Sequence, residues 1–261
     1  MILFKHELRW GRLTLLLWTM VIAFMLGICV LIYPEMKDQM SQISGMFADM
    51  GSFSAAFGMD KINFGEFIGY FGVECGNILG LGGAFFASLL GINALAKEEK
   101  EQTAEFLLTH PVSRSKIVFQ KLWAVITQIF VLNVVAFAVV ILTMGIIGET
   151  GGLKIVALMF LAYFILQLEI SCVCFGISAF ISRGGLGIGL GLAAFCYFLN
   201  IIANLTEEAR FLKYITPFGY TEGADIISRG SIDVKYLSVG LLMTGIGIFI
   251  AFYKYTKKDI V

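Results

Sequence analysis

The sequence is short of charged residues and of proline, and each shortage excludes something. Charged residues make up 15% of the 261 residues, hydrophobic residues make up 58%, and the mean hydropathy is +0.86. Such a chain cannot cover itself with a water-facing surface, which excludes an ordinary soluble domain. The three prolines, Pro34, Pro111 and Pro217, all fall between long apolar runs. These runs are therefore free to form uninterrupted helices.

The sequence also lacks the motifs of several catalytic sites. Its two histidines, His6 and His110, lie far apart, and neither an HExxH nor a GxSxG pattern is present. The segment GETGGLK at 148–154 looks like a phosphate-binding loop, but Leu153 stands where the second glycine of that motif is required. The five cysteines lie in or near apolar runs without metal-ligand spacing. We therefore expect no metal site, no catalytic site and no ATP site in this chain.

The sequence has six apolar runs of the length that a membrane-spanning helix requires, about 20 residues. They are continuous instead of alternating, which excludes the strands of a membrane barrel. The predicted fold is an all-α polytopic membrane protein with one transmembrane domain over residues 1–261. The expected spans are 13–33, 68–96, 122–147, 155–181, 186–202 and 236–253.

The distribution of lysine and arginine predicts the orientation of these spans. Six spans place both termini on one side, together with the 97–121 loop and the short turn after the fourth span. This side carries twelve of the nineteen Lys and Arg residues, whereas acidic residues predominate on the other side. The positive-inside rule makes the basic side cytoplasmic.

Residues 1–12 mix apolar side chains with cations. This pattern is typical of a helix lying on the inner leaflet, although a simple topogenic charge cluster explains it equally well. No small-residue cleavage site follows the first span, so we expect it to remain as an anchor.

Polar groups inside the expected spans are candidates for a translocation path, because they are costly in lipid. Glu169 lies near the middle of the fourth span, Asn133 lies in the third, and Glu74 and Asn77 lie toward the outer end of the second. The alternative is that each one makes a hydrogen bond between helices. Glycine pairs at i, i+4 spacing in the second and fifth spans predict close helix packing.

The 97–121 loop has the pattern of two short helices joined by an elbow. Acidic residues from Glu98 onward occupy the first turn of the first helix, and its semi-apolar stripe ends at Leu108. Pro111 stops this helix, and Ser113 is placed to cap a second helix that runs into the third span. Such an element suits docking to a soluble partner on the cytoplasmic face.

The residues of this loop resemble a known family. The run EQTAEFLL at 101–108, followed by PVSR at 111–114 and by Lys121, is similar to the ExGTxExLLxxPxSR…K segment of type-2 ABC transporter permeases. The departures are Gln102 and Ala104, since many members have glycine and a larger apolar residue there. The stretch FLKYITPFGY at 211–220 and the basic ending at 252–260 also resemble that family.

The resemblance implies the permease subunit of an ATP-driven exporter, which moves a drug, peptide, lipid or ion out across the cytoplasmic membrane of a bacterium. Such a subunit pairs with a second copy or a related permease, and a separate ABC ATPase holds the ATP and Mg. No nucleic-acid partner is expected. The resemblance also implies a helical hairpin on the outer side, between spans five and six. The implied coupling residues are Glu98, Glu101, Thr103, Glu105, Leu108, Pro111 and Arg114.

Two other functions agree with the same sequence. A secondary transporter would use Glu169 and Glu74 as ion or proton relays and would need no ATPase. A permease-like sensor or assembly factor would bind the ATPase and transport nothing.

Overall fold

The computed structural model describes residues 2–49, 51, 54, 56, 62–63, 65–100, 112–181 and 185–258, with the side chains of 41–49 and Lys100 excepted. Every regular element in these residues is a helix. Six helical segments are long and apolar enough to cross a membrane, which confirms the predicted all-α polytopic fold.

The first half of the described chain forms the first two spans and a short helix. The second span is one helical path in three parts, since a π-helical segment separates two α-helices. The elements are α1 (Ile2–Asp49), α3 (Phe67–Cys75), η2 (Gly76–Gly82), α4 (Gly83–Ala94) and α5 (Lys97–Lys100).

The second half forms the other four spans, and three short helices connect the last two of them. The elements are α7 (Arg114–Ile147), α8 (Leu153–Ser178), α9 (Leu186–Leu205), η3 (Glu208–Tyr214), η4 (Pro217–Tyr220), α10 (Gly223–Arg229) and α11 (Val234–Lys257). The expected spans therefore all correspond to helices, and α7 begins eight residues earlier than the apolar run at 122.

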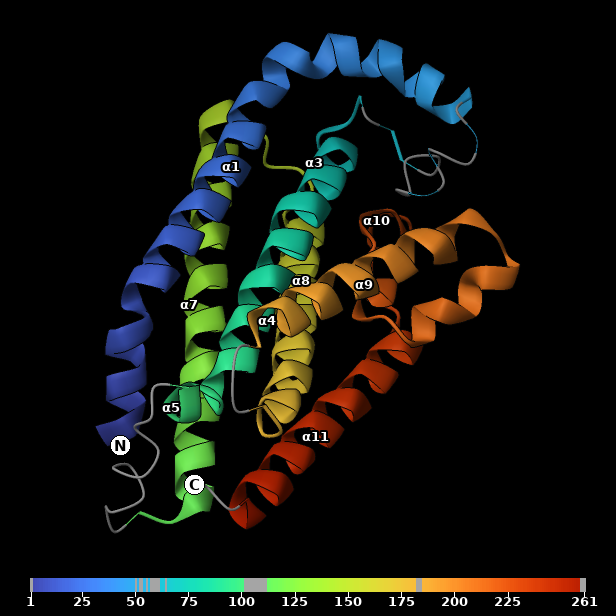
Figure 1. Ribbon diagram of the computed structural model, residues 1–261. Coiled ribbons are helices and arrows are strands. Elements are labelled where there is room, and N and C mark those ends of the chain that lie inside the picture. Colours follow the sequence, from blue (N-terminus) through green and yellow to red (C-terminus); the bar gives the residue numbers. More distant parts are fainter. Residues whose placement is uncertain are drawn as a thin grey trace.

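The first span differs from the prediction in two ways. Residues 2–12 are not a separate interfacial helix, because α1 continues through them without a break, and it also continues through Pro34. Proline removes one backbone hydrogen bond and crowds the preceding turn, which bends a helix more often than it ends one in an apolar setting. Figure 1 shows that α1 rises along the bundle and then bends across its top.

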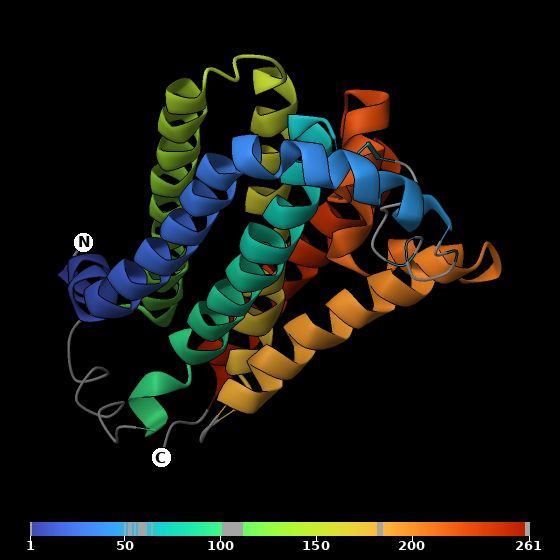
Figure 2. The same cartoon turned by 90° about the horizontal axis from the view of Figure 1, so that it is seen from above.

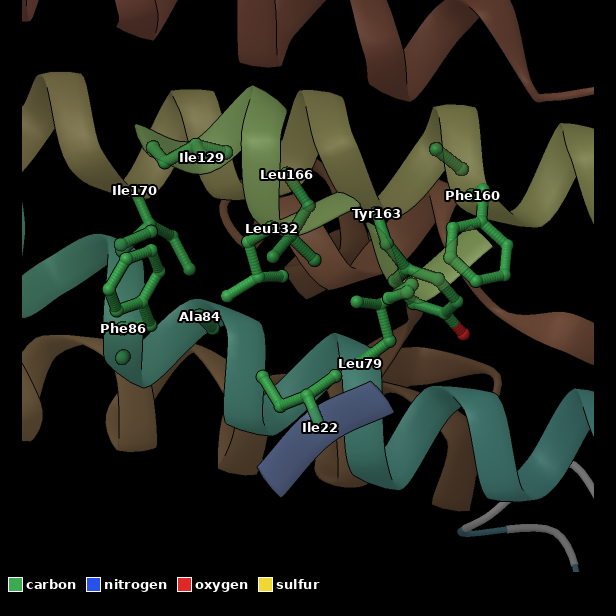
Figure 3. Packing of buried hydrophobic residues seen from close by; sticks show 14 of the residues in the cluster. Ile22, Leu79, Ala84, Phe86, Ile129, Leu132, Phe160, Tyr163, Leu166 and Ile170 are labelled. Carbon is green, nitrogen blue, oxygen red and sulfur yellow. The ribbon is translucent and has the colours of Figure 1, made fainter. Parts of the chain in front are cut away.

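The core lies where α1, the second span, α7 and α8 meet. Figure 3 shows Ile22, Leu79, Leu132 and Leu166 from these four elements packed together. The second span lies between α1 and α9 in both Figure 1 and Figure 2. The outward faces of the spans remain apolar, as lipid contact requires, for example at Phe249 of α11, which is 69% exposed.

Helices α8 and α11 approach each other closely at a pair of glycines. A Cβ atom on Gly176 would lie 2.7 Å from the backbone oxygen of Gly247, and one on Gly247 would lie 2.5 Å from the oxygen of Cys172. Small residues of this kind allow helix backbones in membranes to touch.

Candidate coupling site and the polar groups of the spans

The predicted coupling segment is connected to the bundle through α5 on one side and the start of α7 on the other. Ser113 is the N-cap residue of α7, as predicted, but its side chain makes no capping hydrogen bond. Of the predicted coupling residues, Glu98 and Arg114 are described. The others, Glu101, Thr103, Glu105, Leu108 and Pro111, lie outside the described residues. The described part of the site consists of the two stems that flank this segment, namely α5 and the first turns of α7.

The stem at α5 is held by a buried lysine of α7. The side chain of Lys121 is 1% exposed, and its Nζ donates to Glu7 Oε1 at 3.2 Å and to the backbone oxygen of Ala94 at 2.6 Å. The same Nζ also pairs with the carboxylate of Glu98. One ammonium group thus connects α1, the end of the second span, α5 and α7. Hydrogen bonds to three oxygens offset the cost of burying an ammonium group.

The other stem contacts the end of α11. Arg114 Nη1 donates to the backbone oxygen of Lys258 and, at 3.5 Å, to that of Thr256. Lys258 in turn pairs with Glu99 of α5, with 2.7 Å between Nζ and Oε1. Lysine and arginine side chains interact favourably with the unpaired carbonyl groups at the C-terminal end of a helix. Both stems are therefore joined to α11 as well as to the helices beside them.

Glu7, Glu99, Lys121 and Lys258 were not predicted as site residues from the sequence. Lys121 entered only through the family resemblance, and Glu7 lies 114 positions away from it. Lys258 contributed only to the cytoplasmic charge excess. The N-terminal and C-terminal ends of the described chain both lie at this end of the bundle (Figure 1). This proximity is what brings the four side chains together.

The four polar residues predicted for a translocation path do not meet at one place. Asn133 Nδ2 donates to Gln167 Oε1 at 2.6 Å, and Gln167 Nε2 donates to the backbone oxygen of Leu79 at 3.2 Å. Leu79 belongs to the π-helical segment η2, where a widened turn changes which carbonyl groups are available. Asn133 thus takes part in a hydrogen-bonded chain across α7, α8 and the second span.

Glu169 joins α8 to the connection between the last two spans. The hydroxyl group of Tyr220 donates to Glu169 Oε2 at 2.9 Å, and the carboxyl group is only 5% exposed. Gly240 of α11 provides the space for this carboxyl group, since a Cβ there would lie 3.0 Å from Glu169 Cδ. Tyr220 therefore anchors η4 against α8 and α11.

Glu74 and Asn77 face different neighbours. Glu74 Oε2 lies 4.0 Å from Cys29 Sγ of α1, and Asn77 Oδ1 accepts a hydrogen bond of 3.3 Å from the hydroxyl group of Tyr197 in α9. Asn77 also lines a cavity of about 70 Å³ between the second span, α8, α9 and the 203–235 connection. Of the four predicted residues, Asn77 is the one that lines this cavity.

An ion-pair cluster organises the 203–235 connection. Lys213 Nζ lies 2.7 Å from Glu222 Oε2 and 3.3 Å from Asp225 Oδ2, and the side chain of Lys213 is only 5% exposed. Burial lowers the pKa of Lys213, but the two carboxylates raise it by more, so the net shift is upward. The cluster fixes η3 against the start of α10.

Within the described residues, no group of three or more His, Cys, Asp or Glu side chains is arranged to hold a metal ion. The chemistry of the site is thus that of ion pairs and hydrogen bonds between helices. Together with the six apolar helices, the contacts describe a multi-pass helical membrane protein with ion pairs both near the two termini and in the 203–235 connection.

The comparison with protein families identifies the kind of membrane protein. Residues 1–260 match the family described as ABC-2 family transporter protein, and the chain belongs to this family. It is a membrane permease of an ABC transporter. A comparison with curated proteins gave no match.

Proposed function

We propose that this permease is the membrane-spanning subunit of an exporter and that a separate ATPase, holding ATP and Mg²⁺, drives it. The observation that carries the proposal is the anchoring of both coupling stems. Lys121 ties one stem to α1 and α7, and Arg114 and Lys258 tie both stems to the end of α11. A displacement of the segment between the stems would therefore be passed to three spans at once.

The anchoring also divides the predicted coupling residues into two groups. Glu98 and Arg114 make internal contacts, so in this proposal they hold the segment in place. Contact with the ATPase then falls to the residues between them, namely Glu101, Thr103, Glu105, Leu108 and Pro111. Leu108 supplies an apolar contact and Glu105 a charged one.

In the proposed orientation, the end with both termini faces the cytoplasm of a bacterium. The charge separation along the sequence supports it, because twelve of nineteen cations fall on that side. The exporter then contains two permeases, either two copies of this chain or this chain and a related one. ATP binding would close the ATPases and change the bundle from inward to outward access.

Co-purification tests the coupling directly. An affinity tag inserted in the turn at Gly151, where a Cβ meets no atom within 4 Å, leaves the anchored end of the bundle untouched. We expect the wild-type permease to retain an ATPase and Leu108→Asp to lose it, along with transport-linked ATP hydrolysis. The matched control is Leu153→Asp, which makes the same change in a 49% exposed residue at the opposite end of the bundle. The coupling proposal fails if no ATPase is retained, or if Leu108→Asp has no effect.

Flux in reconstituted vesicles separates this function from the two alternatives. An exporter requires ATP and the ATPase, a secondary transporter responds to the membrane potential without them, and a sensor shows no flux under either condition. Glu74 contacts Cys29 of α1, whereas Glu169 accepts from Tyr220 of η4. The two carboxylates that a secondary transporter would use as relays therefore have different partners.

A further inference from the structure

A cavity of about 280 Å³ lies at the charged end of the bundle, next to the anchored stems. Its walls come from α1, α4 and α7, and Lys97 of α5 and Leu186 at the start of α9 also line it. The four residues predicted for a translocation path, Glu74, Asn77, Asn133 and Glu169, do not line this cavity. Its lining residues are Glu7, Trp10, Gly11, Thr14, Leu89, Leu90, Asn93, Ala94, Lys97, Lys121, Ala124, Val125, Gln128 and Leu186.

The lining combines two chemistries. Glu7, Lys97 and Lys121 supply charges of both signs, and Lys97 Nζ lies 3.2 Å from the centre of the Trp10 ring. Leu89, Leu90, Val125 and Leu186 supply apolar surface. A site with a charged part and an apolar part suits an amphiphile, whose polar and apolar ends need different surroundings.

One buried polar atom of the lining has no hydrogen-bond partner. The side chain of Gln128 is 4% exposed, and its Nε2 donates to the backbone oxygen of Ala124 at 3.3 Å. Among the described residues, nothing donates to its Oε1. Buried acceptors of this kind almost always have a partner, which can be a ligand. The partner has to carry an N–H or O–H group.

We propose that this cavity binds the headgroup of a phospholipid with an amine, from the leaflet at the end where the two termini lie. The lipid ammonium group donates to Gln128 Oε1 and lies near the Glu7 carboxylate. The lipid phosphate group lies on the side of Lys97 and Lys121. A zwitterionic headgroup fits a lining with charges of both signs better than a headgroup of one sign.

The size of the cavity agrees with a headgroup and not with a whole lipid. Sites for drug-sized molecules span about 300 to 1,000 Å³, and this cavity lies just below that range. The acyl chains then run along the lipid-facing surface of α1, which continues from the cavity with Leu13, Leu16 and Leu17, all more than half exposed. The proposal does not depend on the direction of transport or on the ATPase.

The position of Gln128 depends on a glycine of α1. A Cβ atom on Gly11 would lie 2.5 Å from Gln128 Oε1 and 3.2 Å from its Cδ. Gly11→Ala therefore displaces the amide from the wall of the cavity. The matched control is Gly145→Ala in α7, where a Cβ meets no atom within 4 Å. Both changes replace a glycine inside a helix with the best helix former.

The test measures bound lipid by native mass spectrometry after reconstitution into nanodiscs and release into mild detergent. The nanodiscs contain phosphatidylglycerol mixed with either phosphatidylethanolamine or phosphatidylcholine, which lacks an N–H donor. We expect the wild type and Gly145→Ala to retain phosphatidylethanolamine in preference to phosphatidylcholine, and Gly11→Ala to lose this preference. Gln128→Met keeps the side-chain length without the acceptor and weakens retention about fivefold, the effect of one hydrogen bond.

Three results would overturn the proposal. They are equal retention of the two zwitterionic lipids by the wild type, retention of phosphatidylglycerol alone, and unchanged preference in both Gly11→Ala and Gln128→Met. Size-exclusion profiles of the variants show whether each one is folded. If Gly11→Ala is misfolded, the Gln128→Met result decides.

Discussion

Replacing Lys121 with methionine tests the anchoring of the coupling stems most directly. Methionine keeps the length and the apolar stem of lysine and removes only the ammonium group. In the wild type, this ammonium group contacts the carboxylates of Glu7 and Glu98 and the carbonyl oxygen of Ala94, and the side chain of Lys121 is 1% exposed. Its loss removes this donor from two carboxylates and a carbonyl group that lie close together, and Lys97, 3.9 Å from Glu7 Oε2, remains as a cation beside one of them.

The size of the effect follows from the burial of these partners. Removing one member of a buried ion pair costs about 3–5 kcal/mol of unfolding free energy when the remaining charge is fully enclosed. The side chains of Glu7 and Glu98 are 15% and 12% exposed, so they are not fully enclosed. We therefore expect a loss of about 2–3 kcal/mol. For a chain of this length that corresponds to a fall in Tm of roughly 4–12 °C.

The measurement is thermal unfolding of the purified permease in detergent, followed by fluorescence-detected size exclusion. Lys116→Met is the matched control, because Lys116 lies on the exposed side of the first turns of α7, and we expect its effect to stay within about 0.5 kcal/mol. Adding Glu98→Gln to Lys121→Met removes one of the two carboxylates that pair with Lys121, so the double variant should lose less than the sum of the two single changes. Equal stability of Lys121→Met and Lys116→Met would refute the anchoring.

Two further predictions concern contacts between other helices. Gly247→Val should destabilise the bundle by about 1–3 kcal/mol, because its side chain would meet the backbone of α8, whereas Gly245→Val meets nothing within 4 Å and should have little effect in the same thermal assay. Tyr220→Phe should release η4 from Glu169 at a cost of about 1–2 kcal/mol and increase protease cleavage in the 203–235 connection. Tyr253→Phe, which removes the hydroxyl group of a residue that is 55% exposed, should leave cleavage unchanged. Equal cleavage of both variants would show that the hydrogen bond of Tyr220 does not hold η4 in place.

The six spans could be predicted because the membrane imposes length and hydropathy on each of them separately. What a hydropathy pattern detects is the lipid-facing stretch, so it misses helix that continues into water. The start of α7 at Arg114 and the extension of α1 across residues 2–12 and past Pro34 are of this kind. Local sequence sets no boundary there, because packing against neighbouring helices supports the extra turns.

The contacts of the site could be predicted less well, because they join residues that are distant in sequence. The charge pattern placed Lys121 and Lys258 on the same side of the membrane, but it did not indicate that Glu7 and Glu99 would pair with them. Of the glycine pairs singled out from the sequence, Gly189 does lie close to another helix, since a Cβ there would be 3.1 Å from the backbone oxygen of Ser88 in α4, whereas Gly187 and Gly191 meet nothing within 4 Å. The close crossing of α8 and α11 uses Gly176, which was not singled out. Spacing within one helix does not show which face meets another helix.

The position of Lys258 has a practical consequence for experiments on this permease. Its side chain pairs with Glu99 and its carbonyl group accepts from Arg114, so the last described residue lies against both residues that flank the predicted coupling segment. A fluorescent protein or affinity tag fused at this end would compete for space with an ATPase. A fusion that abolished activity would then report obstruction, and not a failure of the transport step.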